Sequence, residues 1–435
     1  MKRNIYKSLI EWKEDVSHKP LLIRGARQVG KTYIVNEFGN NEFNNYINLN
    51  FERNPEYKSI FSTYNPIEII EKIVLFTEKK IQEGKTLIFL DEIQDCPNAI
   101  MSLRYFYEEM PKLHIIGAGS LLEFSLKSND YRMPVGRVQY LYMHPLSFDE
   151  FLQALNQETL KRYISDYTNI RNISEELHNK LINLIRKYFF IGGMPEVVNE
   201  YITSRDVLKC QRIQNSIIET YIDDFSKYSK NSQFNYIQKV FSAIPSMVGE
   251  KVVYANIDRS LKSRDLKLAY ELLETAGIIY KVKRSSGSGL PFEANVKENF
   301  YKSIFIDIGL MHAVNGIYSE TISEKDLTSI YKGSVSEQFV GQELIANSDF
   351  YTKAKLYYWA RESRNSNAEI DFLVSKNEKI VPIEVKSGKK GKLRSLLLFL
   401  DTFKVKKGLK ISQARYKEDE NLISLPFYGI GSFFK

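Results

Sequence analysis

One stretch decides the fold of this chain: Gly25-Ala26-Arg27-Gln28-Val29-Gly30-Lys31-Thr32. It follows the pattern G-x-x-x-x-G-K-[ST] and stands directly behind the apolar run Leu21-Leu22-Ile23. In such a loop the glycines let backbone N–H groups turn toward phosphates, the lysine reaches the β and γ oxygens, and the threonine hydroxyl binds Mg²⁺. The stretch therefore predicts a loop that binds a nucleoside triphosphate.

The flanks of this loop favour the phosphate-binding interpretation over an ordinary glycine-rich turn. Residues 21–23 predict a buried strand, and residues 33–38 can continue as a helix that Gly39-Asn40-Asn41 ends. Strand, loop and helix in this order are what a phosphate-binding loop requires. The residues expected to contact the nucleotide are Gly25, Ala26, Arg27, Gln28, Val29, Gly30, Lys31, Thr32 and Tyr33.

Length and composition restrict the class of protein. A chain of 435 residues is expected to hold about two to four domains, each with its own core. The two cysteines, Cys96 and Cys210, are far apart and belong to no metal-binding pattern, which favours a reducing compartment. No apolar segment follows the N-terminal charges, and no apolar run has the length of a membrane span. We therefore expect a soluble, cytoplasmic protein.

The charge of the chain is positive and unevenly distributed. Lys and Arg number 61 against 53 Asp and Glu, and this formal net charge of +8 would attract polyanions such as nucleic acid. Many basic proteins bind no nucleic acid, so the overall charge decides little by itself. Segment 386–410 carries nine basic residues and one acid, Asp401, which indicates a local basic surface.

An acidic pair follows a second buried strand. Residues 86–90 predict a strand that is covered on both faces of a parallel sheet, and ligands of such sheets gather at the carboxyl end. Asp91 and Glu92 stand at that end. Asp91 would hold the Mg²⁺ shell, and Glu92 would orient or deprotonate the attacking water, because in-line phosphoryl transfer needs a positioned nucleophile. Two surface acids that close a strand are the alternative, which the upstream loop disfavours.

Three further residues are candidates for contact with the γ-phosphate. Ser120 follows a predicted strand and is a candidate sensor, although it could equally cap a helix that starts at Leu121. Arg137, after the polar segment 127–132, could place its charge on a transferring phosphate in its own or a neighbouring subunit. Arg27 competes for that role, and a solvated surface arginine is the alternative for both.

Further motifs accompany the loop and the acidic pair: Gly136-Arg137, Pro145-Leu146-Ser147-Phe148-Asp149-Glu150-Phe151 and Gly192-Gly193-Met194-Pro195. Together they resemble one family, the prokaryotic AAA-type ATPases with a G-A-R-Q-V-G-K-T loop and an L-D-E-I-Q strand end. The resemblance covers nearly the whole chain. It implies an ATPase core followed by a C-terminal domain of unknown function that looks nuclease-like.

The segment from residue 231 to residue 320 has the order helix, helix, hairpin, which is typical of a winged helix. The helices are expected near 236–243 and 263–276, and a hairpin joins 278–282 to a strand near 300–306. Four basic residues by the second helix could face a phosphate backbone: Arg259, Lys262, Arg264 and Lys267. A winged helix also serves as a packing module inside ATPases, and both alternatives stay open.

A second set of carboxylates lies near the C-terminus. Residues 368–374 and 381–386 predict two strands joined by a polar turn. Alternation puts Glu384 and Lys386 on one face of the second strand, and hairpin pairing can bring Asp371 beside them. Two carboxylates beside an ammonium can hold Mg²⁺, while the lysine orients or activates a water against a phosphodiester. An ordinary hairpin with exposed charges is the alternative.

A helix before this hairpin offers a third acid. It is predicted over 334–344 and carries Glu337 and Glu343, either of which could join the metal ligands. With this helix the order of elements resembles the PD-(D/E)xK nuclease pattern, in which an acid on a helix precedes D…E-x-K, although the leading proline is missing. A site with all its acids can also bind DNA without cleaving it, so cleavage stays a separate question.

We therefore expect an α/β protein of four domains: an AAA-type P-loop ATPase core with a parallel sheet (1–154), a helical lid (155–230), a winged helix (231–320) and a restriction-endonuclease-like α/β domain (321–435). The expected activity is Mg²⁺-dependent ATP hydrolysis that controls how the last two domains engage nucleic acid, which we expect to be DNA. The alternative is an ATP-dependent switch or assembly protein whose nuclease-like domain binds partners or DNA without cleaving. ATP and Mg²⁺ are the expected cofactors, and further copies of the chain are expected partners.

Overall fold

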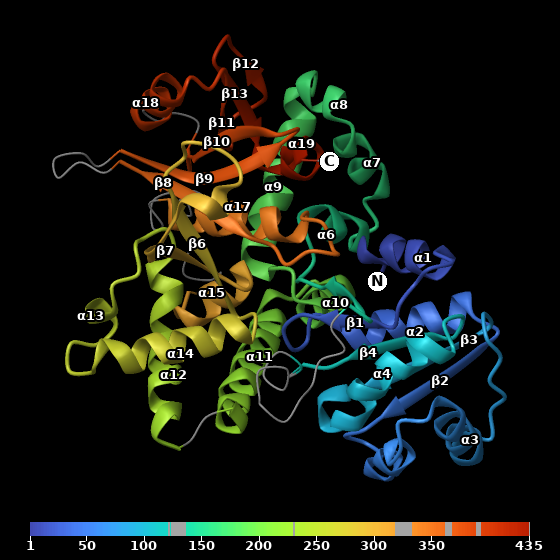
Figure 1. Cartoon of the computed structure of the whole chain (residues 1–435). Coiled ribbons are helices and arrows are strands. Elements are labelled where there is room, and N and C mark those ends of the chain that lie inside the picture. The colour runs from blue at the N-terminus through green and yellow to red at the C-terminus, as the bar shows by residue number, and fades with distance from the viewer. Residues whose placement is uncertain are drawn as a thin grey trace. The chain divides into compact units, whose positions relative to one another are not determined.

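The computed structural model in Figure 1 describes residues 1–120, 122, 136–228, 231–317, 333–361, 368–388 and 393–434. The chain divides into two compact units, one of residues 1–144 with 349–353 and the other of residues 145–348 with 354–435. The predicted lid, winged helix and nuclease-like domain all lie in the second unit, and their separation into three domains stays a prediction. None of the helices in the described ranges is both long enough and apolar enough to cross a bilayer.

The first unit is built on a five-stranded sheet in the order β2-β3-β4-β1-β5, in which all neighbouring strands are parallel. Its strands are β1 (Leu21–Arg24), β2 (Asn45–Asn50), β3 (Thr86–Asp91), β4 (His114–Ala118) and β5 (Gln139–Tyr142). Every residue of β3 is buried, because the strand lies inside the sheet and helices cover both faces. The α/β class and the parallel sheet expected from the sequence are confirmed.

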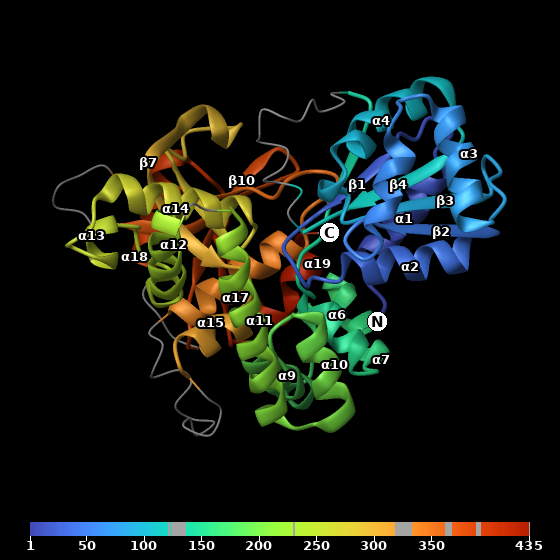
Figure 2. The same cartoon turned by 90° about the horizontal axis from the view of Figure 1, so that it is seen from below.

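Helices cover both faces of this sheet, as Figure 2 shows. On one face Ile88 of β3 packs in one apolar cluster with Ile69 and Leu103 from two helices. On the other face the ring of Trp12 packs edge-on against His114 of β4. The helices of this unit are α1 (Ile5–Glu14), α2 (Lys31–Glu42), α3 (Pro66–Thr77) and α4 (Pro97–Glu109), with two 3₁₀ helices, η1 (Pro55–Phe61) and η2 (Ile93–Asp95).

Helix α2 runs beyond its predicted end. The sequence predicts a stop at Gly39-Asn40-Asn41, and this prediction is wrong because the helix continues to Glu42. A Cβ at residue 39 would lie only 2.3 Å from Cδ2 of Tyr46 on β2. Gly39 therefore makes room for a strand side chain and does not end the helix.

The second unit begins with a series of helices, as predicted from residue 155 onward. The first helix starts with a capping box, in which the side chains of Ser147 and Glu150 each accept a hydrogen bond from the other residue's backbone N–H. Helix α9 ends before Gly192, whose φ of 73° favours glycine. The helices of this unit are α6 (Phe148–Ala154), α7 (Glu158–Ser165), α8 (Tyr167–Arg171), α9 (Glu175–Ile191), α10 (Pro195–Ser204), α11 (Val207–Tyr228), α12 (Asn231–Ala243), η3 (Ile244–Met247), α13 (Tyr254–Ile257), α14 (Ser263–Thr275), η4 (Phe292–Asn295), α15 (Ile308–Val314), α17 (Ser334–Ala346), α18 (Arg394–Phe403), η6 (Phe427–Gly429) and α19 (Ile430–Phe434).

An eight-stranded mixed sheet forms the rest of the second unit, in the order β12-β13-β11-β10-β9-β8-β6-β7. Its strands are β6 (Ile279–Ser285), β7 (Val296–Phe305), β8 (Leu356–Ala360), β9 (Glu369–Lys376), β10 (Lys379–Val385), β11 (Gly408–Ser412), β12 (Lys417–Glu418) and β13 (Leu422–Pro426). The predicted C-terminal hairpin is present as β9 and β10. Strand β6 pairs antiparallel with β7 and parallel with β8, so the hairpin predicted as a wing continues the sheet of the C-terminal strands.

Candidate functional sites

The loop between β1 and α2 has the backbone that its motif predicts. Gly25 and Gly30 have φ values of 146° and 99°, and Gln28 has a φ of 64°. A Cβ at residue 25 would lie 2.2 Å from the carbonyl oxygen of Met143, so only glycine fits there. Such a backbone allows successive amides to face a phosphate group, and the positive end of α2 favours the same anion.

Lys31 is buried at the first residue of α2. Its Nζ donates to the carbonyl oxygens of Gly25 at 2.9 Å and Ala26 at 2.8 Å. Burial lowers the pKa of Lys31 to about 8, although the negative charges of Glu92 and Asp91 act against this shift. Both hydrogen bonds go to neutral oxygens, and a triphosphate would offer charged acceptors, which bind an ammonium more strongly.

The structure brings the two predicted magnesium ligands of the first unit together. Oγ1 of Thr32 donates to Oδ1 of Asp91 at 3.0 Å, and Nδ2 of Asn50 donates to Oδ2 at 2.8 Å. Burial raises the pKa of Asp91, and the two hydrogen bonds act against this shift. A hydroxyl and a carboxylate are oxygen ligands of the kind that Mg²⁺ prefers. Thr32 and Asp91 therefore fit a magnesium ion that arrives with a nucleotide.

Sequence reasoning did not identify Asn50. The signal was present, because Asn50 ends the strand that pairs with β3, in register with Asp91. Parallel neighbours end at the same edge of a sheet, so a polar residue at the end of β2 lies beside the acid at the end of β3.

Glu92 is held by two neighbours at the same edge of the sheet. Its backbone is left-handed, with a φ of 50°, which a non-glycine residue rarely adopts. Oε2 of Glu92 accepts hydrogen bonds from Nε2 of Gln94 at 2.7 Å and from the backbone N–H of Ser120 at 3.3 Å. Ser120 thus meets Glu92 through its main chain, and Gln94 is a contact that the sequence reasoning missed. The helix expected from Leu121 falls outside the described ranges.

The two candidate arginines lie in different places. Nε of Arg137 donates to Oε1 of Glu108 on α4 at 2.9 Å, and the pair is partly exposed. Arg27 lies within the phosphate-binding loop, and its charge contributes to the lowered pKa of Lys31. The polar segment 127–132, expected before Arg137, lies outside the described ranges. Which arginine contacts a phosphate stays a prediction.

A second group of charged side chains lies in the second unit and is referred to below as the charged cluster. It comes from β7, α17, β9 and β10. Its members are joined by ion pairs or by the hydrogen bond of a neighbouring backbone N–H. They are Lys302, Glu337, Glu369, Asp371, Glu384 and Lys386. Four of the six were predicted from the sequence, whereas Lys302 and Glu369 were not.

Lys302 contacts three acids of the charged cluster. Its side chain is 4 % exposed, and its Nζ lies 3.4 Å from Oε2 of Glu337 and 3.8 Å from Oδ1 of Asp371. Lys302 also forms a hydrogen-bonded ion pair with Glu369. Burial by itself would lower the pKa of Lys302, but the three carboxylates outweigh it and raise this pKa above its usual value. Lys302 is therefore a buried, charged ammonium.

The hairpin arranges Asp371, Glu384 and Lys386 as the sequence suggested. Nζ of Lys386 donates to Oε1 of Glu384 at 2.5 Å, and the backbone N–H of Val385 donates to Oδ2 of Asp371 at 2.7 Å. Oε2 of Glu384 is buried, and no described residue donates a hydrogen bond to it. Burial and the charge of Asp371 raise the pKa of Glu384, while Lys386 acts against this shift.

The charged cluster does not fit a divalent ion shared by Glu337, Asp371 and Glu384. Across the described residues, no group of three or more Asp, Glu, His or Cys side chains is arranged to hold a metal ion. The ammonium of Lys302 contacts Glu337 and Asp371 in place of such an ion. Asp371 and Glu384 remain as a pair of carboxylates beside Lys386, and their role as ligands stays a prediction.

Glu343, the alternative third acid, lies apart from the charged cluster. Its Oε1 accepts a hydrogen bond from the backbone N–H of Phe148 at 2.7 Å, and its Oε2 accepts one from Nδ2 of Asn347 at 3.2 Å. Burial and the charge of Asp149 raise the pKa of Glu343 to about 8. Six helical positions separate Glu343 from Glu337, which puts the two side chains on different faces of α17.

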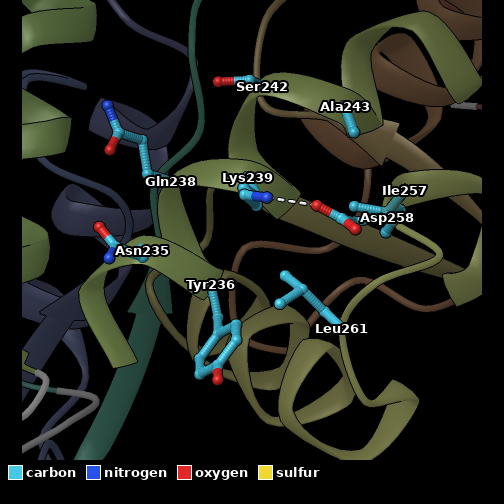
Figure 3. Close-up of a pocket in the computed structure, with 9 residues that line it drawn as sticks. All are labelled: Asn235, Tyr236, Gln238, Lys239, Ser242, Ala243, Ile257, Asp258 and Leu261. Atoms are coloured by element: carbon cyan, nitrogen blue, oxygen red, sulfur yellow. Dashed lines mark hydrogen bonds and ion pairs between the residues drawn. The ribbon is translucent and has the colours of Figure 1, made fainter. Parts of the chain in front are cut away.

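The basic residues expected to face nucleic acid are exposed. They lie before α14 and in its first turns, and they are Arg259, Lys262, Arg264 and Lys267. A cavity of about 690 Å³ adjoins the same segment between α12 and α13. Figure 3 shows that Lys239 of α12 pairs with Asp258 in this cavity. The cavity is therefore polar and adjoins a basic stretch of surface.

The basic surface expected over 386–410 is only partly available. Lys410 is buried in β11, and Lys407 forms an ion pair with Glu418 at 2.6 Å. Residues 389–392, which carry three of the expected lysines, lie outside the described ranges. The exposed basic residues by α14 are therefore the better candidates for phosphate contact.

Comparison with known protein families assigns one part of the chain. Residues 17–152 match a family described as AAA domain. Residues 182–321 and 332–428 match two families described as domains of unknown function, DUF8612 and DUF4143. The first match supports a P-loop ATPase of the AAA type, in agreement with the loop geometry. No curated protein matches the chain.

Three solved structures show weak similarity. A Walker-type ATPase of Pyrococcus abyssi is 17 % identical with a TM-score of 0.46, covering 71 % of this chain and 94 % of that chain. The ORC2 protein of Aeropyrum pernix is 10 % identical with a TM-score of 0.32, covering 73 % and 92 %. The RuvB Holliday junction branch migration motor of Thermotoga maritima is 17 % identical with a TM-score of 0.29, covering 64 % and 89 %. Scores this low carry no inference about activity.

Proposed function

We propose that this protein is a Mg²⁺-dependent ATPase whose nucleotide state controls how its second unit engages nucleic acid, and that this nucleic acid is DNA. The contact between Thr32 and Asp91 carries the ATPase part of the proposal, because it joins the end of the phosphate-binding loop to the acid at the end of β3. A P-loop enzyme uses these two groups around its magnesium ion. The AAA match over residues 17–152 supports the same activity.

In the proposed reaction the loop amides and Lys31 hold the phosphates, and Glu92 orients the water that attacks the γ-phosphorus. A bound Mg²⁺ ion would neutralise charge on the β- and γ-phosphate oxygens. Glu92 can keep one orientation because Gln94 and the backbone N–H of Ser120 both donate to the same oxygen of its carboxylate. Loss of the γ-phosphate would then change the environment of Glu92, and the backbone after β4 would receive that change through Ser120.

Nucleic acid is the proposed partner because of charge. The chain has a formal net charge of +8, and exposed basic side chains gather by α14. Contacts between such side chains and phosphates release bound counterions, so the affinity must fall steeply with salt. Replacing Arg264 and Lys267 together by alanine should weaken binding on all sequences and lower the salt dependence by about two phosphate contacts. An unchanged salt dependence would argue against this surface as the docking site.

Control by nucleotide is tested with labelled single-stranded and double-stranded DNA in an anisotropy titration. The Glu92→Gln protein loaded with ATP represents the state before hydrolysis, and the wild-type protein with ADP represents the state after it. We expect the two states to differ in DNA affinity by about tenfold or more, which is the usual size of coupling between two sites. Equal affinities for every DNA form would contradict nucleotide control.

A second candidate function is an ATP-dependent switch or assembly protein whose second unit binds DNA or partners without cleaving. The position of Lys302 favours it, because an ammonium contacts two of the acids that a nuclease would use for metal. Plasmid nicking with Mg²⁺ or Mn²⁺ distinguishes the candidates. Nicking that disappears in Asp371→Ala or Lys386→Ala, with ATP turnover intact, supports a nuclease. No nicking with any metal, together with nucleotide-dependent oligomerisation, supports the switch.

A further inference from the structure

The charged cluster holds a cation that belongs to the chain itself. Glu369 and Asp371 lie two residues apart on β9, so their side chains share one face of the strand. Glu337 approaches from α17, and all three carboxylates contact Nζ of Lys302 on β7. Four charged side chains from three elements therefore meet at one ammonium.

The surroundings of Lys302 are fitted to this ammonium. The ring centroid of Tyr358 lies 5.4 Å from Nζ of Lys302, and the face of an aromatic ring attracts a cation. The backbone at Gly249 packs against the carboxylate of Glu337, since a Cβ there would lie 2.9 Å from Oε2. The distances of 3.4 Å and 3.8 Å from Nζ to two of the acids are those of ion pairs, whereas ligands of Mg²⁺ or Ca²⁺ lie at about 2.0–2.6 Å.

We propose that Lys302 is the resident cation of the charged cluster: its ammonium takes the place that a divalent ion would hold among Glu337, Glu369 and Asp371, and it excludes such an ion from the native protein. Three acids that converge in a partly buried site repel one another, and a cation among them removes this repulsion. An ammonium supplies one positive charge without an open coordination position. The inference rests on the charged cluster alone and holds whether or not the proposed ATPase or DNA binding is found.

The proposal is tested by removing the ammonium and measuring metal binding to the full-length, nucleotide-free protein. Every variant carries Asp91→Asn, so that the magnesium ligands of the first unit do not contribute. Binding of Mn²⁺ is followed by the loss of the electron paramagnetic resonance signal of the free ion. Lys302→Met should bind one additional Mn²⁺ ion, about tenfold or more tightly than the parent protein binds any, because three carboxylates then lack a cation.

Lys251→Met is the matched control. Lys251 also pairs with Glu369, at 3.7 Å, and forms an isolated bridge with Lys302, but it is exposed. This variant should bind Mn²⁺ as the parent protein does, since the buried ammonium is still in place. A tight Mn²⁺ site in the parent protein that Asp371→Asn removes would overturn the proposal.

A second variant covers the case in which Lys302→Met does not fold. Lys302→Met combined with Glu369→Gln removes one positive and one negative charge together, so the net charge of the cluster is unchanged. Glu337 and Asp371 then remain without the ammonium, and Mn²⁺ should raise the unfolding temperature of this double variant but not that of the parent protein. Absence of both Mn²⁺ binding and stabilisation in the folded variants would overturn the proposal.

Discussion

Oγ1 of Thr32 donates a hydrogen bond of 3.0 Å to Oδ1 of Asp91. The two residues come from the start of α2 and the end of β3, and strand β4 lies between β1 and β3 in the sheet. A crossover of this kind leaves a crevice at the carboxyl ends of parallel strands, where ligands of open α/β sheets bind. The contact therefore places the loop and the acidic pair at one edge, with Ser120 at the end of the intervening strand.

Glu92→Gln should bind Mg²⁺-ATP as the wild type does but turn it over about 100-fold or more slowly. The glutamine leaves the phosphate loop and Asp91 unchanged and removes the carboxylate that orients the water. Single-turnover hydrolysis and nucleotide binding are measured on the same preparation. Turnover equal to that of the wild type would contradict the role of Glu92.

Asn50→Ala should raise the Mg²⁺ concentration needed for half-maximal turnover by about tenfold. Asn50 contacts only Asp91 through its Nδ2, and partners that orient a metal ligand have effects of this size. The matched control is Asn48→Ala, because Asn48 lies on the same strand but donates to Asn36. If both variants shift the magnesium requirement equally, the effect belongs to the strand and not to the contact with Asp91.

Arg27→Ala should lower ATP turnover by about tenfold or more, whereas Arg137→Ala should leave it near the wild-type value. Arg27 lies in the loop, and Arg137 forms a partly exposed ion pair with Glu108 that contributes about 1 kcal/mol or less. Arg104→Ala is the control, since Arg104 pairs with the same oxygen of Glu108 at 3.1 Å. A much larger loss in Arg137→Ala than in Arg104→Ala would show that Arg137 reaches the phosphate.

Glu343 should make the second unit less stable as the pH rises. Its pKa is raised from 4.5 to about 8, so the folded protein keeps a proton that the unfolded chain releases between these values. The free energy of unfolding therefore falls as the pH rises through this window. Asp149 and Glu150 of α6 face Glu343, and Lys161 of α7 lies 4.0 Å from Asp149.

Glu343→Gln tests this pH dependence. Glutamine can still accept the hydrogen bond from the backbone N–H of Phe148, but it does not titrate. Urea unfolding of both proteins at about pH 5.5 and about pH 8 should show a smaller loss of stability in the variant. An equal loss in both proteins would mean that the other groups of α6 and α7 cause it.

Sequence patterns were sufficient for the elements of the first unit. The loop, the buried run before Asp91 and the order of strands and helices follow from local spacing, so their positions could be predicted. The end of α2 could not, because Gly39 answers to the ring of Tyr46 on a neighbouring strand. Local propensity alone does not reveal a close approach of that kind.

Contacts between distant segments account for what the sequence did not show. Lys302 stands in a strand that was read as part of a wing, 69 residues before Asp371, and only the shared sheet brings the two together. Strand alternation did predict that Asp371, Glu384 and Lys386 lie near one another. Side-chain contacts such as those of Asn50 and Gln94 required strand order and backbone direction, which spacing does not give.

Calorimetric titration of Mg²⁺-ATP into the nucleotide-free protein tests the central claim most directly. The account predicts one binding site per chain in the wild type and loss of that binding in Lys31→Ala, because the loop then lacks the ammonium that contacts the phosphates. The absence of any nucleotide binding by folded wild-type protein, with magnesium present, would contradict the account.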